Sequence, residues 1–216
     1  MTIPTLVDHC TYLEVFDKII ESADDGIVIV EIGVFVGGSV CYLSQKLKEK
    51  NIDYKIIAID NFKFSNISPQ DNEKYAHNLQ PYIAYSNNIR KFQANVITIV
   101  GDSIEISQLF KDNTIDFLYI DGDHSEYCIK ELKNWLPKMK ENSLIAGHDY
   151  DGSIHVRKAC KKYLGIFHTT SNNASYYKQI GDGIVGKRKI ITPKVKARIF
   201  LYLYSWYKWF MELVGR

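Results

Sequence analysis

The sequence predicts an α/β fold, a three-layer sandwich in which helices cover both faces of a mostly parallel sheet. Five short runs rich in Ile, Val or Phe alternate with longer amphipathic stretches, which is the order expected of βαβ units. The short runs are nearly continuous in apolar character, as expected for strands buried on both faces of a parallel sheet. A hydrophobic content of 46% and a charged content of 24% are typical of a globular protein and exclude a disordered or fibrous chain.

The expected elements follow one another along most of the chain. The five parallel strands are Ile27–Ile32, Tyr54–Asp60, Val96–Gly101, Asp116–Asp121 and Ser143–Gly147. Helical patterns precede and separate them over Leu6–Ser22, Ser39–Lys50, Asp71–Phe92, Ile104–Phe110 and Glu126–Lys140. In the last of these helices, apolar residues recur at helical spacing and lysines fill the other face. The polar, proline-containing segment Phe62–Gln70 is expected to be a loop or lid.

The chain after the fifth strand predicts an antiparallel hairpin at the C-terminal edge of the sheet. A short helix over Ser153–Leu164 is followed by two expected strands, Phe167–Thr170 and Ile184–Arg188. Turn residues lie between these strands, namely Asn172, Asn173, Gly181 and Gly183. Since 216 residues are near the ~150 typical of one domain, we expect one domain over residues 1–192 and a helical appendage over residues 193–216.

The appendage differs in composition from the rest of the chain. A block of basic residues leads into it, namely Lys187, Arg188, Lys189, Lys194, Lys196 and Arg198. The aromatic-rich run Ile199–Phe210 follows; it is shorter than the ~20 apolar residues of a spanning helix and contains Lys208. Two interpretations stay open. One is a helix that packs on the domain or on a second subunit of a homodimer, and the other is an interfacial helix that makes peripheral membrane contact through residues 194–214.

Charge and cysteine content indicate which partners and which compartment to expect for the protein. Lys and Arg number 27 and Asp and Glu 25, so the net charge of +2 is too balanced for a dedicated nucleic-acid binder. The four cysteines are scattered and form no CxxC pair, which predicts free thiols in a reducing compartment. The N-terminus lacks a basic start followed by an apolar run, so no signal peptide is expected. We therefore expect a cytoplasmic protein, peripheral at the membrane if the appendage binds lipid.

A glycine-rich turn follows the first expected strand. The segment Glu31–Ser39 reads EIGVFVGGS, and its three glycines allow a sharp turn and a close approach of the backbone to a ligand. Ser39 is placed to cap the next helix, whose N-terminus favours anionic groups. The glycines are Gly33, Gly37 and Gly38, which departs from the GxGxxG of dinucleotide-binding turns.

Carboxylates follow the second and third expected strands at the edge where open parallel sheets bind ligands. Asp60, followed by Asn61, can accept hydrogen bonds from both ribose hydroxyls of an adenosine-type ligand. Asp102, followed by Ser103, is placed to accept from an exocyclic adenine amine. A solvated strand end or a helix cap explains each acid taken singly, but Glu31, Asp60 and Asp102 at three successive strand ends predict a ligand site.

The fourth and fifth strand ends carry acids and histidines. Asp121 precedes Asp123 and His124, and His148 precedes Asp149. Carboxylates from two neighbouring strand ends suit Mg²⁺, whereas imidazole suits zinc, iron or manganese better. His124 is the expected general base, because an imidazole with an unperturbed pKa of ~6.5 is largely neutral at pH 7. Asp123 is expected to orient His124 or to act as the base itself.

Five segments together resemble a known family. They read EIGVFVGGS, IIAIDNF, VGDS, FLYIDGDHSEY and LIAGHDY. Their order is similar to that of the class I S-adenosylmethionine-dependent methyltransferases, within them to the branch of catechol-type and bacterial sugar and macrolide O-methyltransferases. The resemblance covers residues 14–189 and implies a Rossmann-like fold. It also implies cofactor binding by Glu31, Gly33, Gly37, Ser39, Asp60, Asn61, Asp102, Ser103 and Asp121.

The resemblance assigns roles within this set. The glycine-rich turn and Ser39 are implied to line the methionine moiety, Asp60 to bind the ribose, and Asp102 with Ser103 to hold adenine. In the similar family, an acid at the position of Asp121 and a pair at His148-Asp149 bind a divalent metal, Mg²⁺ or Mn²⁺ here, and two substrate hydroxyls. His148 departs from that family because it replaces an oxygen ligand.

The expected activity is methyl transfer from S-adenosylmethionine to a hydroxyl of a sugar, a glycan or a sugar-containing small molecule. A catechol-like phenol is the second acceptor, and a lipid-linked glycan is a third if the appendage contacts membrane. Asp121, Asp123 and His124 form the expected catalytic set. Two alternatives stay open: a nicotinamide-dependent oxidoreductase, for which the GxGxxG turn is missing, and a non-catalytic protein that binds an adenosyl ligand.

Overall fold

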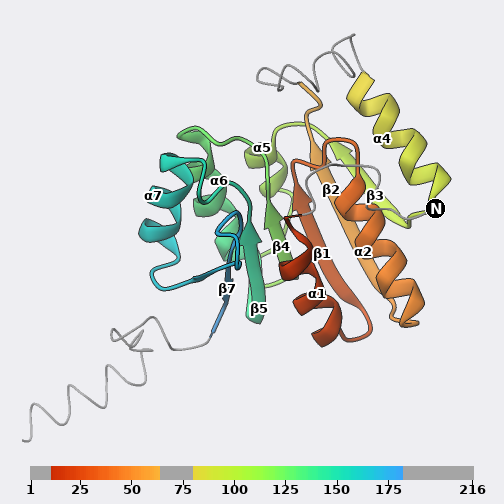
Figure 1. Cartoon of the computed structure of the whole chain (residues 1–216), viewed down its shortest axis with the longest axis horizontal. Coiled ribbons are helices and arrows are strands. Elements are labelled where there is room, and N and C mark those ends of the chain that lie inside the picture. The colour runs from red at the N-terminus through yellow and green to blue at the C-terminus, as the bar shows by residue number, and fades with distance from the viewer. Residues whose placement is uncertain (1–10, 64–79, 182–216) are drawn as a thin grey trace, which may run out of the picture. The chain divides into compact units, whose positions relative to one another are not determined.

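The computed structural model describes residues 11–63 and 80–181, which form helical layers on a seven-stranded sheet (Figure 1). The strands are β1 (Ile27–Ile32), β2 (Tyr54–Asp60), β3 (Val96–Val100), β4 (Ile115–Ile120), β5 (Met139–Gly147), β6 (His168–Thr169) and β7 (Tyr176–Gln179). The helices are α1 (Leu13–Ser22), α2 (Gly38–Glu49), α4 (Gln80–Lys91), α5 (Ser103–Ser107), α6 (Tyr127–Trp135) and α7 (Ile154–Tyr163), with the 3-10 turn η2 (Leu136–Lys138). The expected α/β class is confirmed.

The sheet has the expected mostly parallel topology. Its strands lie in the order β3-β2-β1-β4-β5-β7-β6. Neighbours from β3 to β5 pair in parallel, whereas β7 pairs antiparallel with both β5 and β6. The antiparallel hairpin at the C-terminal edge is therefore present.

The second strand of this hairpin differs from the prediction. It is β7, which occupies part of the segment expected to be the turn, while Ile184–Arg188 lies outside the described residues. The Tyr-rich β7 lacks β-branched residues, yet its pairing with Leu144–Gly147 of β5 buries Tyr176 in the core. The tyrosines favour a strand, and the burial of Tyr176 fixes its place against β5.

The helix expected over Glu126–Lys140 is also shorter than predicted. It ends at Trp135, η2 follows, and β5 begins already at Met139. Pro137 explains the early end, since it has no backbone N–H to donate to the carbonyl of Lys133 and so cannot continue the helix. Met139 is buried and pairs with Ile115 of β4, so tertiary packing takes it out of the helical pattern.

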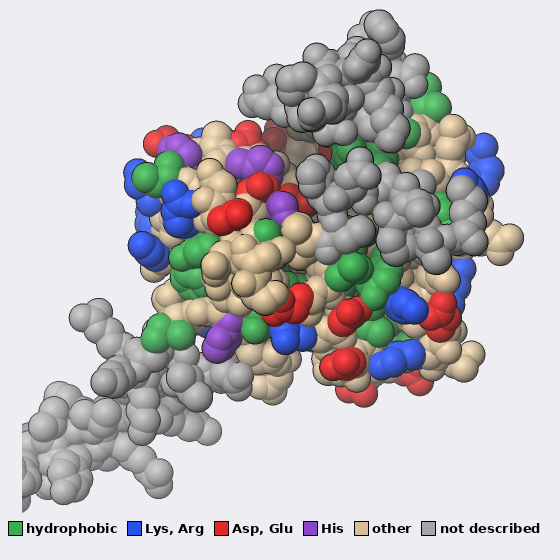
Figure 2. Space-filling view, in the orientation of Figure 1, with side chains coloured by type: hydrophobic (Ala, Val, Ile, Leu, Met, Phe, Trp, Pro, Cys, Tyr) green, Lys and Arg blue, Asp and Glu red, His purple; other side chains and the backbone are tan. Residues whose placement is uncertain are grey.

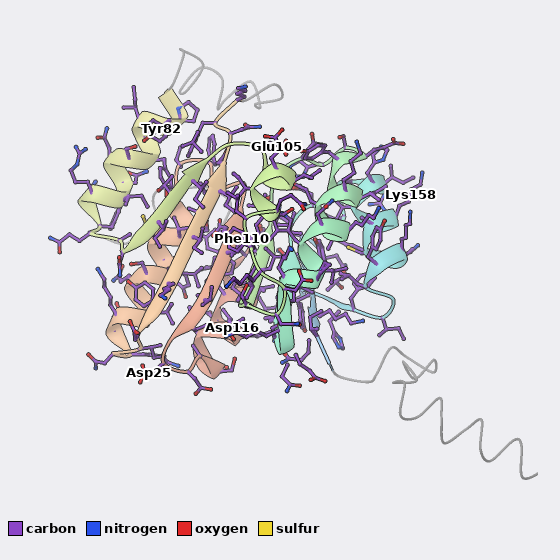
Figure 3. The ribbon with its side chains drawn as sticks, turned by 180° about the vertical axis from the view of Figure 1, so that it is seen from behind. Asp25, Tyr82, Glu105, Phe110, Asp116 and Lys158 are labelled. Atoms are coloured by element: carbon purple, nitrogen blue, oxygen red, sulfur yellow. The ribbon has the colours of Figure 1, made fainter. Side chains whose placement is uncertain are left out.

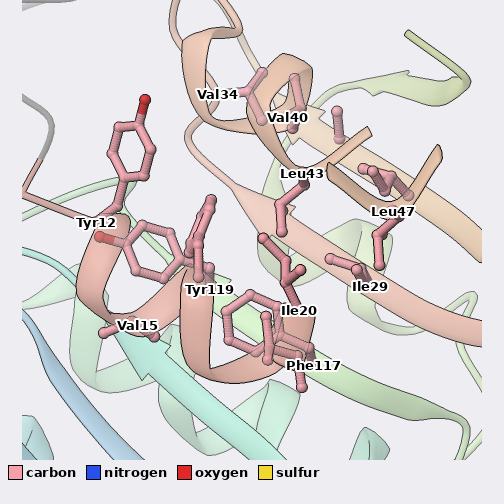
Figure 4. Close-up of a cluster of buried hydrophobic side chains, with 14 of the residues drawn as sticks. Tyr12, Val15, Ile20, Ile29, Val34, Val40, Leu43, Leu47, Phe117 and Tyr119 are labelled. Atoms are coloured by element: carbon pink, nitrogen blue, oxygen red, sulfur yellow. The ribbon is translucent and has the colours of Figure 1, made fainter. Parts of the chain in front are cut away.

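Two apolar clusters lie on opposite faces of the sheet. One joins α1 and α2 to β1 and β4, as Figure 4 shows. In this cluster the ring of Phe16 on α1 lies edge-on to Tyr119 of β4, with 4.9 Å between ring centroids. The other cluster joins α6 and α7 to the opposite face and contains the fully buried Trp135. These layers hold the central strands rigidly and thereby position the loops at the strand ends.

The edge strand β3 is not buried on both faces, contrary to the prediction. Ile97 and Val100 are 54% and 57% exposed. Periodicity alone does not distinguish an edge strand from a central one, because the same β-branched composition serves both. On the face of the sheet that carries the α6–α7 cluster, α5 is only five residues long. The burial of the strand residues decreases accordingly from β1 through β2 to β3.

Several expectations fall outside the described residues. They concern the start of the first helix, most of the loop after β2 with the start of the following helix, and the C-terminal appendage. A compact unit covers Met1–Asp182, and the second unit, Gly183–Arg216, is not described. None of the described helices is both long and apolar enough to span a bilayer.

Candidate active site

The ends of the five parallel strands meet at one edge of the sheet. Four backbone hydrogen bonds continue the strand pairing beyond the last strand residues: Gly33 N to Ile59 O (2.9 Å), Asp121 N to Ile32 O (2.7 Å), His148 N to Ile120 O (3.0 Å) and Gly101 N to Asp60 O (3.0 Å). The structure thus brings the predicted site segments together at a single rim. Figure 2 shows acidic and histidine side chains gathered on the visible face.

The glycine-rich turn after β1 is shaped by contact with the end of β4. Gly33 has φ +80°, and a Cβ at this position would lie 2.1 Å from the carbonyl oxygen of Asp121. Gly37, at the start of α2, has φ +82°, and a Cβ at this position would lie 2.8 Å from the ring of Tyr85. Both positions therefore require glycine because of neighbouring protein atoms as well as backbone conformation.

Asp60 binds the glycine-rich turn through its own carboxylate. Its Oδ2 accepts from the backbone N–H groups of Val34 and Phe35 at 2.9 and 3.0 Å, and its Oδ1 accepts from Phe62 N at 2.7 Å. The Asp60 carboxylate is thus surrounded by backbone N–H groups of the glycine-rich turn and of the segment after β2. Burial raises the pKa of Asp60, although the backbone hydrogen bonds oppose this shift.

Glu31 is a buried carboxyl beneath the same turn. Its side chain is 1% exposed, and Ser39 Oγ donates to its Oε1. The other oxygen, Oε2, has no hydrogen-bond partner among the described residues. Burial raises the pKa of Glu31 to about 8, against the opposing hydrogen bond from Ser39. A cationic ligand group at this end of the rim would satisfy the free oxygen.

The segment after β3 forms a second carboxyl cluster. Asp102 caps α5 through Oδ1, which accepts from Ile104 N (2.9 Å) and Glu105 N (3.0 Å), and its Oδ2 accepts from the Tyr127 hydroxyl. Burial raises the pKa of Asp102, but these hydrogen bonds outweigh it and the net shift is downward. Asp102 is therefore a helix cap whatever else it binds.

Glu131 completes this second cluster and gave no signal in the sequence. It is 2% exposed, its Oε1 accepts from Ser103 Oγ at 2.5 Å, and its Oε2 has no partner among the described residues. Burial raises its pKa to about 7. A Cβ on Gly122 would lie 3.2 Å from Glu131 Oε1, so Glu131 supports the loop after β4 from below.

Acids and histidines converge at the ends of β4 and β5. His148 Nδ1 lies 3.0 Å from Asp149 Oδ2 and 3.6 Å from Asp121 Oδ1. On its other side, Nε2 lies 2.5 Å from the hydroxyl of Thr11. Burial lowers the pKa of His148, but the hydrogen bond to Asp149 and the charge of Asp121 outweigh it and raise the pKa to about 9. Burial raises the pKa of Asp121 to about 7, although His148 opposes the shift.

His124 joins this group through Asp149 rather than through Asp123. Its Nδ1 lies 3.1 Å from Asp149 Oδ2, and its side chain is 48% exposed. Asp123 Oδ1 instead accepts from Ser125 N at 2.6 Å. The residue that orients the expected base is therefore Asp149, which has a left-handed backbone at φ +56°.

The residues expected to bind a metal fit a divalent cation. One ligand atom from each of Asp121, His148 and Asp149 lies within 4.8 Å of the others. A metal would have to displace the proton that His148 Nδ1 shares with Asp149; with Nε2–H donated to Thr11, Nδ1 would then be the ligand atom. A mixed set of imidazole and carboxylate favours Mn²⁺ over Mg²⁺.

A comparison with protein families decides the class. The family described as "Methyltransferase domain" matches residues 30–150, which is more than half of the chain and includes all of the strand ends of the rim. This chain belongs to the methyltransferase domain family. The expected relation to the class I S-adenosylmethionine-dependent methyltransferases is thereby confirmed. No curated protein matches it in sequence.

Solved structures show the same fold. CalS11, a calicheamicin methyltransferase, is 16% identical with a TM-score of 0.60, covering 79% of this chain and 77% of that chain. The O-methyltransferase NovP is 19% identical with a TM-score of 0.57, covering 77% and 76%. An rRNA methylase from Streptococcus thermophilus is 10% identical with a TM-score of 0.54, covering 81% and 99%. The architecture of this methyltransferase is therefore shared by enzymes with different acceptors.

Proposed function

We propose that this methyltransferase transfers a methyl group from S-adenosylmethionine to a hydroxyl of a sugar or sugar-containing molecule. The observation that carries the proposal is the rim, where carboxyls of β1 and β2 meet an acid–histidine group at the ends of β4 and β5. CalS11, whose structure is also described as that of a TDP-rhamnose 3'-O-methyltransferase, and NovP support an oxygen acceptor and, for CalS11, a sugar. The family favours methyl transfer over the nicotinamide alternative.

In this proposal, different strand ends of the rim bind different parts of the cofactor. The buried Glu31, with one free carboxyl oxygen, suits the ammonium of the methionine moiety. Asp60, at the end of β2, is placed to accept a hydrogen bond from a ribose hydroxyl. Ser103 and Asp102 lie at the next strand end, where the adenine is expected. S-Adenosylmethionine supplies the electrophilic methyl group.

His124 and Asp149 handle the proton of the acceptor hydroxyl. With the proton of His124 on Nδ1, which lies 3.1 Å from Asp149 Oδ2, Nε2 would be the basic nitrogen. As the acceptor oxygen forms its bond to the methyl carbon, the carbon–sulfur bond breaks and the hydroxyl proton passes to Nε2. Asp149 then stabilises the imidazolium.

Asp121, His148 and Asp149 would hold a divalent ion and so place the acceptor. Such an ion lowers the pKa of a bound hydroxyl. Thr11 and the backbone of β5 fix the orientation of His148 for this role. In-line attack requires the oxygen to lie about 3 Å from the methyl carbon, so this orientation affects the rate.

The experiment is a transfer assay with labelled S-adenosylmethionine against nucleotide sugars, free glycosides and catechols, with EDTA and then with Mn²⁺ or Mg²⁺ added back. We expect transfer to a sugar hydroxyl that EDTA abolishes and Mn²⁺ restores. His124→Ala should lower kcat at least roughly 100-fold. The matched control is His168→Ala, an exposed histidine stacked on Tyr177.

Three results would contradict parts of this proposal. Transfer to phenols alone would show that the acceptor is a phenol and not a sugar. Full activity in EDTA would show that the reaction needs no metal. Binding of S-adenosylmethionine without transfer to any acceptor would favour the non-catalytic alternative.

A further inference from the structure

Ser153, at the start of α7, joins the two loops that carry the proposed base and its partner. The loop from β4 to α6, residues 121–126, contains His124, and the loop from β5 to α7, residues 148–153, contains Asp149. The hydroxyl of Ser153 donates to the backbone carbonyl of His124 at 2.6 Å, across 29 positions of the chain. Ser153 is not among the site residues predicted from the sequence.

The same hydroxyl is the N-cap of α7. Its oxygen accepts from the backbone N–H groups of His155 at 3.2 Å and of Val156 at 3.3 Å. Because the helix occupies the lone pairs of this oxygen, its single proton is directed at the carbonyl of His124. The side chain of Ser153 is buried, so these contacts are shielded from water. The start of α7 therefore fixes where the backbone of His124 lies.

The backbone of Ser153 holds the other loop. Its N–H donates to the carbonyl of Asp149 at 2.9 Å, which closes a turn in which Asp149 has φ +56°. Arg157, one turn into α7, stabilises this turn because its guanidinium donates to the carbonyls of the two residues after Asp149, at 3.0 and 2.7 Å. Ser153 thus contacts the backbone of both loops, whose side chains meet where His124 Nδ1 lies 3.1 Å from Asp149 Oδ2.

Packing holds the ring of His124 only weakly. Its side chain is about half exposed, and the neighbouring Asp123 accepts from Ser125 N rather than from the imidazole. The position of the His124 backbone therefore decides whether the ring reaches Asp149. A displacement of about 1 Å at a reacting group can cost a factor of about 100 in rate.

We propose that Ser153 is a positioning residue: its hydroxyl holds the backbone of His124 so that the ring meets Asp149 and presents Nε2 to the acceptor hydroxyl. The inference rests on the proposed function, in which His124 receives the acceptor proton. Helix α7 is the rigid support. Marked by Lys158 in Figure 3, it packs beside α6, and its buried residues belong to the same apolar cluster.

Three substitutions separate positioning from helix capping. Ser153→Thr keeps both the cap and the donor. Ser153→Asp keeps a cap, but its carboxylate has no proton for the carbonyl of His124, and Ser153→Ala loses both functions. Circular dichroism and thermal unfolding establish that each variant is folded, and only Ser153→Ala should lose a few degrees of unfolding temperature from the missing cap.

NMR of the full chain with ¹⁵N-labelled histidines tests the contact without an acceptor. In long-range ¹H–¹⁵N spectra of the neutral ring, the wild-type protein should carry the His124 proton mainly on Nδ1, as the contact with Asp149 requires. Ser153→Ala and Ser153→Asp should both shift this proton toward Nε2, and Ser153→Thr should not. His124→Gln assigns the signal.

The rate of methyl transfer is the second measurement, made with labelled S-adenosylmethionine and the same panel of nucleotide sugars, glycosides and catechols. Ser153→Ala and Ser153→Asp should lower kcat at least roughly tenfold, with little change in the KM for S-adenosylmethionine. Ser153→Thr should keep kcat within about twofold of the wild-type value. A residue that only stabilised the fold would not give this separation of kcat from KM.

Ser44→Ala is the matched control. The hydroxyl of Ser44 is also buried and hydrogen-bonded, to Tyr54 and to Asn95 N, but it lies at the opposite end of β2 from the rim. This variant should lose stability without moving the His124 proton or changing kcat. Equal changes in Ser44→Ala would overturn the inference, because general destabilisation would then explain them.

Further outcomes would also overturn it. One is a wild-type His124 protonated mainly on Nε2, and another is a ring that stays unchanged in both Ser153→Ala and Ser153→Asp. An effect confined to Ser153→Ala would reflect helix capping, and one confined to Ser153→Asp would reflect added charge. A wild-type protein that transfers no methyl group would contradict the proposed function alone, since the NMR spectra would still decide whether Ser153 positions His124.

Discussion

At the residue scale, side chains far apart in sequence complete the groups at the strand ends. Thr11 contacts His148 across 137 positions of the chain, and Glu131 supports Ser103 from a different helix. The sequence predicted the strand-end acids and histidines because each follows its strand directly. It did not predict their hydrogen-bond partners, since those depend on tertiary packing rather than on local pattern.

Thr11 is predicted to position His148. Thr11→Val removes the hydroxyl while keeping the shape of the side chain, so His148 loses the contact that orients its ring. Loss of such a partner typically weakens metal binding 10–100-fold, and we expect roughly tenfold weaker Mn²⁺ binding by titration calorimetry. Thr11→Ser retains the hydroxyl and should bind Mn²⁺ as the wild type does. Equal Mn²⁺ binding by the wild type and both variants would show that Thr11 does not position His148.

Because Glu131 is buried, we expect the free energy of unfolding to fall as the pH rises above 4.5. Burial raises its pKa from 4.5 to about 7, so the folded state binds more protons than the unfolded state between these values. The free energy of unfolding should therefore decrease from about pH 4.5 to about pH 7, by at most about 3 kcal/mol. Above pH 7 the loss is complete.

Glu131→Gln keeps an acceptor for Ser103 and removes the titrating group. Urea unfolding should show the variant to be more stable than the wild type at pH 8, with the difference disappearing near pH 4. The exposed Glu126→Gln, at the start of α6, serves as the control and should show no such convergence. A variant that is less stable at pH 8 would contradict a penalty from the buried charge.

At the element scale, central strands were predicted closely because strands buried on both faces carry continuous apolar runs. β1 and β2 match their predicted bounds, and the strand-end motifs follow them. One error is β7, whose tyrosines favour a strand but stand between turn residues. The other is the early start of β5, where tertiary contacts override the helical pattern. The exposed β3 shows the converse, since an edge strand can carry the pattern of a buried one.

The glycine-rich turn permits a test that separates strain from collision. Gly26 and Gly33 have nearly the same φ, +82° and +80°, but a Cβ on Gly26 meets nothing within 4 Å. Gly26→Ala should therefore cost about 1 kcal/mol of stability, from backbone strain alone. Gly33→Ala should cost more than about 3 kcal/mol, because its Cβ would overlap the backbone of Asp121.

Chemical denaturation of the two variants measures this difference. Titration calorimetry should also show that Gly33→Ala binds S-adenosylmethionine weakly, because the turn must move away from the end of β4. Similar losses of stability in both variants would mean that the turn relaxes around the added methyl group.

At the scale of the whole molecule, the rim couples cofactor binding to the stability of the sheet. The segments that follow the five parallel strands meet there, and backbone hydrogen bonds join them to neighbouring strand ends. A ligand held by several of these segments opposes their separation and stabilises the folded state by mass action. At a free concentration of a hundred times its dissociation constant, a ligand specific for the folded state contributes about 2.7 kcal/mol.

S-Adenosylmethionine is therefore expected to raise the unfolding temperature of the full chain, whereas NAD should leave it unchanged. The rise should persist in His168→Ala, which lies outside the rim. It should shrink in Glu31→Gln, because this variant has no carboxyl group that can ionise beside the ligand's ammonium. Differential scanning calorimetry at matched ligand concentrations measures the unfolding temperatures of the wild type and of the two variants. An equal rise with NAD would show that the rim recognises adenosine alone and not the sulfonium amino acid that methyl transfer requires.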